Sequence, residues 1–315
     1  MHRLWLCIPL VAGAFLACGS FGGDSSDPSD ESPDAGADTS TLPDVAPPSE
    51  DAKPPPACDL EQPFGSPTPL KVDTTFSIES ARPVNDAPED IISAACETAT
   101  LDSCDVYRTN LADLGTGNGK LTALSLAKAE ESFPFLHADS QSVFFARGQV
   151  DGGPASPRRL HVAANTSAPP TPLTFMPLSD SDKEPFIVGD TLYFVRVFAG
   201  AGRVWSVKID KTGALVSEAT QTPLPFQGNL FSPVVSADHE EIFLSVEGNP
   251  KFQLKSARRV TGSKAYVEHP AFSALTADPV LYPVWLSPDR CTIWIVTKAS
   301  GSANHGRVQV MTRPK

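Results

Sequence analysis

A pattern of apolar and polar positions recurs five times along the chain. Each copy contains a proline near its start, continues through a short turn that usually carries aspartate, and ends in β-branched and aromatic residues. The copies span residues 80–96, 132–147, 183–196, 231–246 and 282–297, and their prolines (83, 134, 185, 233 and 283) lie 51, 51, 48 and 50 residues apart. Short strands with such a period are typical of a β-propeller, whose blades pack only against neighbours. We therefore expect an all-β propeller with five blades, and six blades as the alternative.

Each copy holds two clear strand patterns. The first is apolar on both faces, as expected for a sheet between two blades (142–147, 191–196, 241–246, 291–297), and the second alternates (105–109, 159–163, 203–207, 252–256, 307–311). A weaker strand follows at 120–125 and 172–176, and the first copy is the least regular because residues 91–95 lack aromatic side chains. Residues 63–74 look like a strand with no blade of its own. We expect this N-terminal strand to complete the last blade and close the ring.

One turn and the strand after it resemble a known repeat. Residues 287–289 (Ser-Pro-Asp) and 292–294 (Thr-Ile-Trp) look like the turn and strand of TolB-like propeller repeats, which are relatives of WD repeats. Weaker copies stand at 237–238 and 138–139, whereas residues 290–291 are Arg-Cys where these repeats often have glycine and a polar residue. The resemblance implies a propeller of the bacterial cell envelope that binds other macromolecules. It carries over no catalytic residue.

The N-terminus predicts export. A short basic start precedes an apolar run at 4–16, which is shorter than the roughly 20 residues of a membrane-spanning helix but fits a signal peptide. The residues before Cys18 resemble a bacterial lipobox, so we expect removal of 1–17 and lipidation of Cys18. Gly19 after the cysteine favours a lipid-anchored protein of the outer membrane, facing the periplasm or the cell surface. The alternatives are an ordinary signal peptide and an uncleaved anchor.

A polar tether separates the anchor from the propeller. Of the 38 residues in 19–56, 28 are Pro, Gly, Ser, Asp or Glu, and nine acidic residues face one lysine. Such a segment buries too little apolar surface to offset its ordering entropy, so we expect 18–56 to be disordered. The tether contributes −8 to the net charge of −12. Residues 57–315 are therefore only mildly acidic, which argues against nucleic acid as a partner.

The cysteine count agrees with an oxidising compartment. Apart from Cys7 and Cys18 there are four, at positions 58, 96, 104 and 291. Four cysteines allow three pairings, of which we expect Cys96–Cys104, which encloses a short segment, and Cys58–Cys291, which would tie the closing strand to the last blade. Metal binding is the rival interpretation, but the sequence has no CxxC motif and no histidine at ligand spacing.

Candidate chemical motifs are incomplete. Residues 287–294 also resemble the Asp box of sialidases, but Cys291 and Ile293 replace its glycine and threonine; residues 114–120 depart from a phosphate-binding loop at both ends. The scattered histidines and the pairs Arg158-Arg159 and Arg258-Arg259 suggest surface positions. We assign no catalytic, cofactor-binding or metal-binding residue and expect no cofactor. The expected function is a non-enzymatic scaffold for an envelope protein or glycan; the alternative is an envelope hydrolase or lyase with its site in the propeller funnel.

Overall fold

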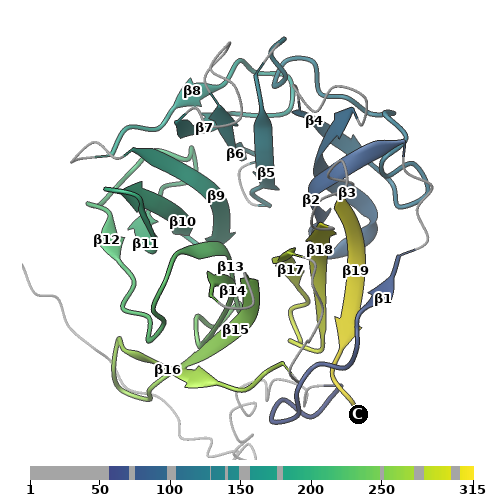
Figure 1. Ribbon diagram of the computed structural model, residues 1–315. Coiled ribbons are helices and arrows are strands. Elements are labelled where there is room, and N and C mark those ends of the chain that lie inside the picture. The colour runs from purple at the N-terminus through teal and green to yellow at the C-terminus, as the bar shows by residue number, and fades with distance from the viewer. Residues whose placement is uncertain are drawn as a thin grey trace, which may run out of the picture. The chain divides into compact units, whose positions relative to one another are not determined.

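The computed structural model describes residues 57–70, 75–97, 104–127, 129–138, 141–148, 157–175, 180–248, 252–272, 280–298 and 306–315. Within these ranges the strands form five antiparallel sheets around a common centre (Figure 1). The innermost strands touch one another in a closed circle, from the first blade through the fifth and back to the first. The chain is therefore a five-bladed β-propeller, as the repeat predicts, and the six-bladed alternative is wrong.

Each blade runs outward from its innermost strand. Blade 1 contains β2 (Phe76–Val84), β3 (Ala87–Glu97) and β4 (Cys104–Thr109), and blade 2 contains β5 (Glu131–Leu136), β6 (Val143–Gly148), β7 (Arg158–Ala163) and β8 (Thr171–Pro172). Blade 3 contains β9 (Ser181–Val188), β10 (Thr191–Phe198), β11 (Ala201–Lys208) and β12 (Thr220–Gln221), and blade 4 contains β13 (Leu230–Val235), β14 (Glu241–Glu247), β15 (Phe252–Arg259) and β16 (Tyr266–His269). Blade 5 contains β17 (Val280–Leu286), β18 (Thr292–Lys298), β19 (Gly306–Thr312) and β1 (Thr68–Pro69).

The N-terminal strand closes the ring, as expected. Strand β1 pairs antiparallel with β19, with Thr68 opposite Val310. Within the described part of the expected 63–74, the strand covers only Thr68–Pro69, and Phe64 instead donates its backbone N–H to Ala271 of the neighbouring blade at 2.8 Å. The N-terminal segment thus joins blades 4 and 5. The strand expected at 120–125 is absent from the described residues of blade 1, where Lys120 makes only an isolated bridge to Tyr107.

The repeated prolines mark bulges in the innermost strands. Pro134, Pro185 and Pro233 occupy equivalent positions, because each falls within an irregularity between its inner strand and the next. The residue before each has a positive φ: Phe133 (53°), Glu184 (58°) and Ser232 (49°). In blades 1 and 5 the prolines instead keep Cα partners, Ile91 for Pro83 and Ile295 for Pro283. An irregularity follows each of these prolines, and blade 1 has another between Ile78 and Ser80. A bulge turns a side chain away from the pleat, so these positions redirect groups near the central channel.

The Asp-containing turns are structural. In blade 5, Asp289 accepts hydrogen bonds from the Ser287 hydroxyl and from the Cys291 N–H (3.0 Å), while Thr292 donates its N–H to the Ser287 hydroxyl at 2.9 Å. Ser236 and Asp238 form the same arrangement in blade 4. A short polar side chain that satisfies the turn backbone explains why this motif repeats.

The hydrophobic core lies between blades. One cluster joins Ile78 and Ile91 of blade 1 to Val284, Trp294 and Val308 of blade 5, and similar clusters fill the other junctions. Burial on both faces explains the apolar character of the second strands. In the described ranges, no helix has the length and hydropathy needed to cross a membrane.

Candidate functional site: the central channel

All five blades contribute to one cavity at the centre of the ring. Its volume is about 320 Å³, and it is lined where the innermost strands end and turn into the second strands. Apolar side chains supply most of the wall, with Ile92, Phe135, Ile187, Val235 and Leu286 each coming from a different blade. Concave, largely apolar sites with a few polar groups are typical of ligand-binding pockets.

Arg82 is the buried cationic side chain among the residues that line this cavity. Its side chain is 2% exposed, although it lines the cavity wall. The guanidinium makes cation–π contacts with the rings of Phe135 and Phe186, 5.3 Å from each centroid, and its Nη1 donates to the Pro185 carbonyl at 2.7 Å. Burial lowers the pKa of Arg82 to about 9, and the nearby carboxylate of Glu184 opposes this effect. The side chain therefore carries a positive charge at neutral pH.

Weaker polar groups surround the cavity mouth. Asp86 is exposed and accepts a hydrogen bond from the indole Nε1 of Trp285 at 3.3 Å. His137 is buried, and its Nε2 lies 3.0 Å from the Gly189 carbonyl. Both groups already have protein partners, so Arg82 is the charge available to a ligand inside the cavity.

A second set of charged side chains lies near the beginnings of the innermost strands. Lys298 forms an ion pair with Glu79. The Nζ of Lys183 lies 3.4 Å from Oε1 of Glu184, and Oε2 of Glu184 accepts a hydrogen bond from the Ser232 N–H at 2.5 Å. Arg158 pairs with Glu130. We call Glu79, Glu184, Lys183, Lys298 and Arg158 the charged cluster. Its carboxylates come from different blades, and each has a cationic partner.

Tyr282 lies next to the charged cluster. Phe252, Phe231 and Phe133 surround its ring, with centroids 6.0, 6.4 and 6.5 Å away. Burial raises the pKa of the Tyr282 phenol well above its usual range, and the charges of Glu184 and Glu79 raise it further. The hydroxyl therefore stays protonated at physiological pH.

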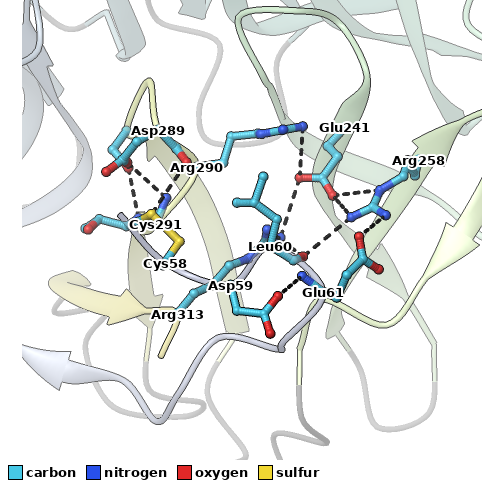
Figure 2. The surroundings of a disulfide bond; sticks show 12 residues. Cys58, Asp59, Leu60, Glu61, Glu241, Arg258, Asp289, Arg290, Cys291 and Arg313 are labelled. Atoms are coloured by element: carbon cyan, nitrogen blue, oxygen red, sulfur yellow. Dashed lines mark hydrogen bonds and ion pairs between the residues drawn. A yellow bond between two sulfur atoms is a disulfide. The ribbon is translucent and has the colours of Figure 1, made fainter. Parts of the chain in front are cut away.

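The four cysteines form two disulfides, in the expected pairs. Cys96 and Cys104 lie opposite each other on β3 and β4. Cys58 is bonded to Cys291, which ties the N-terminal segment to blade 5 (Figure 2). Cys18 lies outside the described residues.

Buried charges reinforce the junction beside Cys58–Cys291 (Figure 2). Glu241 is 1% exposed, and its carboxylate accepts hydrogen bonds from the Nη2 and Nε of Arg258 at 2.8 and 3.1 Å. The Nη2 of Arg313 lies 3.5 Å from the other oxygen of this carboxylate. Arg258 also pairs with Glu61 at 2.7 Å, and Arg313 donates to the Leu60 carbonyl at 2.9 Å. We call this the closing cluster, because it joins the N-terminal segment, blade 4 and the C-terminus. Most of its charged groups pair with one another, although the Arg313 Nε is buried without a hydrogen-bond partner among the described residues.

The structure separates the two arginine pairs considered in the sequence. Arg158 belongs to the charged cluster and Arg258 to the closing cluster, so they do not form a common basic rim. Sequence reasoning missed Arg82, whose only signal was a cation directly before one of the repeated prolines. Among the described residues, no group of His, Cys, Asp and Glu side chains is arranged to hold a metal ion.

Comparison with known proteins supports the fold only. No family model and no curated protein matches the sequence. A solved structure of regucalcin, a calcium-binding protein from Agrobacterium tumefaciens, matches with a TM-score of 0.51 and 13% identity, covering 81% of this chain and 96% of that one. A putative TolB from the same organism matches with a TM-score of 0.49 and 15% identity, covering 76% of this chain and 78% of that one. An endo-arabinase from Bacteroides thetaiotaomicron matches with a TM-score of 0.49 and 13% identity, covering 80% of this chain and 97% of that one. The chain thus shares a propeller fold with regucalcin at 13% identity, and a likeness at this level shows the fold alone.

Proposed function

We propose that the chain is a non-enzymatic binding protein whose propeller holds a ligand, or part of a macromolecular partner, at the mouth of the central cavity. The main support for this proposal is the cavity itself. Its described lining residues come from all five blades and are largely apolar, and Arg82 is the buried charged residue among them. A site assembled from five blades is rigid, which lowers the entropic cost of binding. The charged cluster supports the same view, because its carboxylates are already paired with cations.

The proposed setting is the bacterial outer membrane, with Cys18 lipidated and residues 19–56 acting as the tether. The composition of the tether and the two disulfides support export to an oxidising compartment. Replacement of Cys18 by serine should release the protein from the membrane fraction or leave it unprocessed. The anchor proposal fails if the variant fractionates with membranes as before and the wild type carries no acyl chain.

Photo-cross-linking in the cells that make the protein tests the binding proposal. A cross-linking amino acid at Ala237, which is exposed and lines the cavity, should capture a defined partner in an intact envelope. The same amino acid at Val216, which is 61% exposed between β11 and β12, is the matched control. Identical adducts from both positions, or none from Ala237, would argue against binding at this mouth.

A hydrolase is the second candidate, favoured by one observation. Glu79 and Glu184 both influence the buried phenol of Tyr282, and pairs of carboxylates serve as acid and base in glycoside hydrolysis. Against it, each carboxylate has a lysine partner. Turnover of envelope glycans by the purified domain, lost on Glu79→Gln or Glu184→Gln, would establish this alternative and overturn the proposal of a binding protein. We expect no turnover.

A further inference from the structure

The guanidinium of Arg82 is charged, buried and incompletely bonded. Its Nε–H is buried without a hydrogen-bond partner, and only the Nη1 donates to a described protein acceptor, the Pro185 carbonyl. No carboxylate in the described ranges lies within ion-pair distance of it. An unpaired buried cation is costly, and cation–π contact with Phe135 and Phe186 offsets only part of that cost.

Glu184 does not neutralise this charge. The carboxylate of Glu184 acts on Arg82 electrostatically, but its two oxygens are occupied by Lys183 and by the Ser232 N–H. Asp86 is the other nearby acid, and it lies exposed at the mouth, where water screens it. The cavity wall therefore contains a positive group whose hydrogen-bonding capacity is not filled by the described residues and that has no carboxylate within ion-pair distance.

The rest of the cavity specifies an apolar body. A volume of about 320 Å³ equals that of about ten water molecules, which suits one aromatic or branched aliphatic group together with a small head group. The walls supply aromatic and aliphatic surface from Phe135, Phe186, Ile187 and Leu286. Arginine presents a planar set of donors that matches a carboxylate.

We propose that the cavity binds a carboxylate attached to an apolar group, with Arg82 as the residue that recognises the anion. This inference rests on the proposed binding function and names the chemistry of its ligand. Two sources share that chemistry: a free small acid, and the C-terminus of a partner that ends in a large apolar residue.

Four probes separate these possibilities in a titration followed by ligand-observed NMR. They are 4-phenylbutyrate, its neutral amide 4-phenylbutanamide, the peptide N-acetyl-Gly-Phe with a free carboxylate, and the same peptide as its C-terminal amide. At least one acid should bind the wild type at least tenfold more tightly than its amide, as a charge-assisted hydrogen bond requires. Tighter binding of the peptide acid assigns a protein C-terminus, and tighter binding of phenylbutyrate assigns a small acid.

Arg82→Met keeps the length of the side chain and removes its charge. In this variant the acids should lose their advantage while binding of the amides stays within about twofold, and Arg82→Lys should restore part of the preference. Equal affinity of acid and amide for the wild type overturns the anion inference but leaves binding at the cavity intact. A preference that survives Arg82→Met overturns Arg82 as its source, and the absence of binding by all four probes overturns the ligand class. The wild-type comparison decides the matter even if the variants fail to fold.

Discussion

At the scale of single residues, three partly buried histidines make the fold sensitive to acid. Burial lowers the pKa of His161, His239 and His269 below the usual value. His161 stacks on Phe145, and His239 Nδ1 lies 2.9 Å from the Tyr193 hydroxyl. The folded chain therefore holds these rings neutral, whereas the unfolded chain protonates them below about pH 6.5.

The sign of the pH effect follows from proton binding. Where the unfolded state binds more protons, the free energy of unfolding rises with pH, so the histidine contribution is present above pH 6.5 and is lost as the pH falls. We expect His161→Gln with His239→Gln to reduce the loss of stability between pH 6.5 and 5, relative to wild type. Urea unfolding at several pH values measures this. A steeper loss in the variant would contradict the assigned pKa directions.

The comparison with wild type is needed because Glu131 acts in the opposite sense. Burial raises the pKa of Glu131 to about 7, and the guanidinium of Arg147, 2.7 Å away, reduces that shift. Its contribution to stability is fully present below about pH 4.5 and is lost as the pH rises through about 7. The absolute pH profile mixes both effects, whereas the difference between variant and wild type isolates the histidines.

At the scale of strands and blades, the sequence predicts the repeated strands and turns better than the positions of the bulges. Apolar second strands and Ser-x-Asp turns recur because each blade must bury two faces and satisfy a tight turn, and both needs are local. The structural positions of the repeated prolines are less regular than their spacing in the sequence. The bulges at Pro134, Pro185 and Pro233 depend on pairing with the next strand. Pairing is a long-range property, so the different placement of Pro283 could not be derived from spacing.

The candidate site was harder to predict for the same reason. Arg82 faces the channel only because five blades close around it, and its contacts with Phe135 and Pro185 bring together residues from three blades. Its position directly before one of the repeated prolines does not by itself show that it faces the channel. The disulfide pairs were easier to predict, since Cys96 and Cys104 are close in the chain and Cys58 precedes the segment that pairs with the last blade.

The closing cluster gives a prediction at the level of blade junctions. Glu241→Gln should lower the free energy of unfolding by about 3–5 kcal/mol, because it leaves Arg258 and Arg313 around a buried neutral group. Glu268→Gln is the matched control, since that side chain is 55% exposed and pairs only with Lys255, so its loss should stay below about 1 kcal/mol. Equal effects of the two substitutions in urea unfolding would show that the closing cluster does not hold the junction.

At the scale of the whole molecule, the two disulfides should differ in importance. Cys58–Cys291 spans 233 residues and Cys96–Cys104 spans 8. The chain-entropy model gives upper limits of about 5.5 and about 2.5 kcal/mol, respectively, for their contributions. Serine at both members of each pair, in separate variants, should therefore destabilise the ring more at Cys58–Cys291. Guanidinium unfolding checks the order, and a larger loss at Cys96–Cys104 would contradict the view that ring closure is the main role of the N-terminal segment.

The central claim is that binding takes place in the cavity shared by all five blades, and one substitution tests it most directly. Ala237→Trp places a large ring at the cavity mouth, while the turn hydrogen bonds, which use Ser236 and Asp238, remain. Calorimetric titration with 4-phenylbutyrate or N-acetyl-Gly-Phe, whichever acid binds the wild type more tightly, should show at least a tenfold loss of affinity for Ala237→Trp and no change for Val216→Trp at an exposed site outside the cavity. Unchanged affinity in Ala237→Trp would contradict the account, because the ligand would then be binding elsewhere.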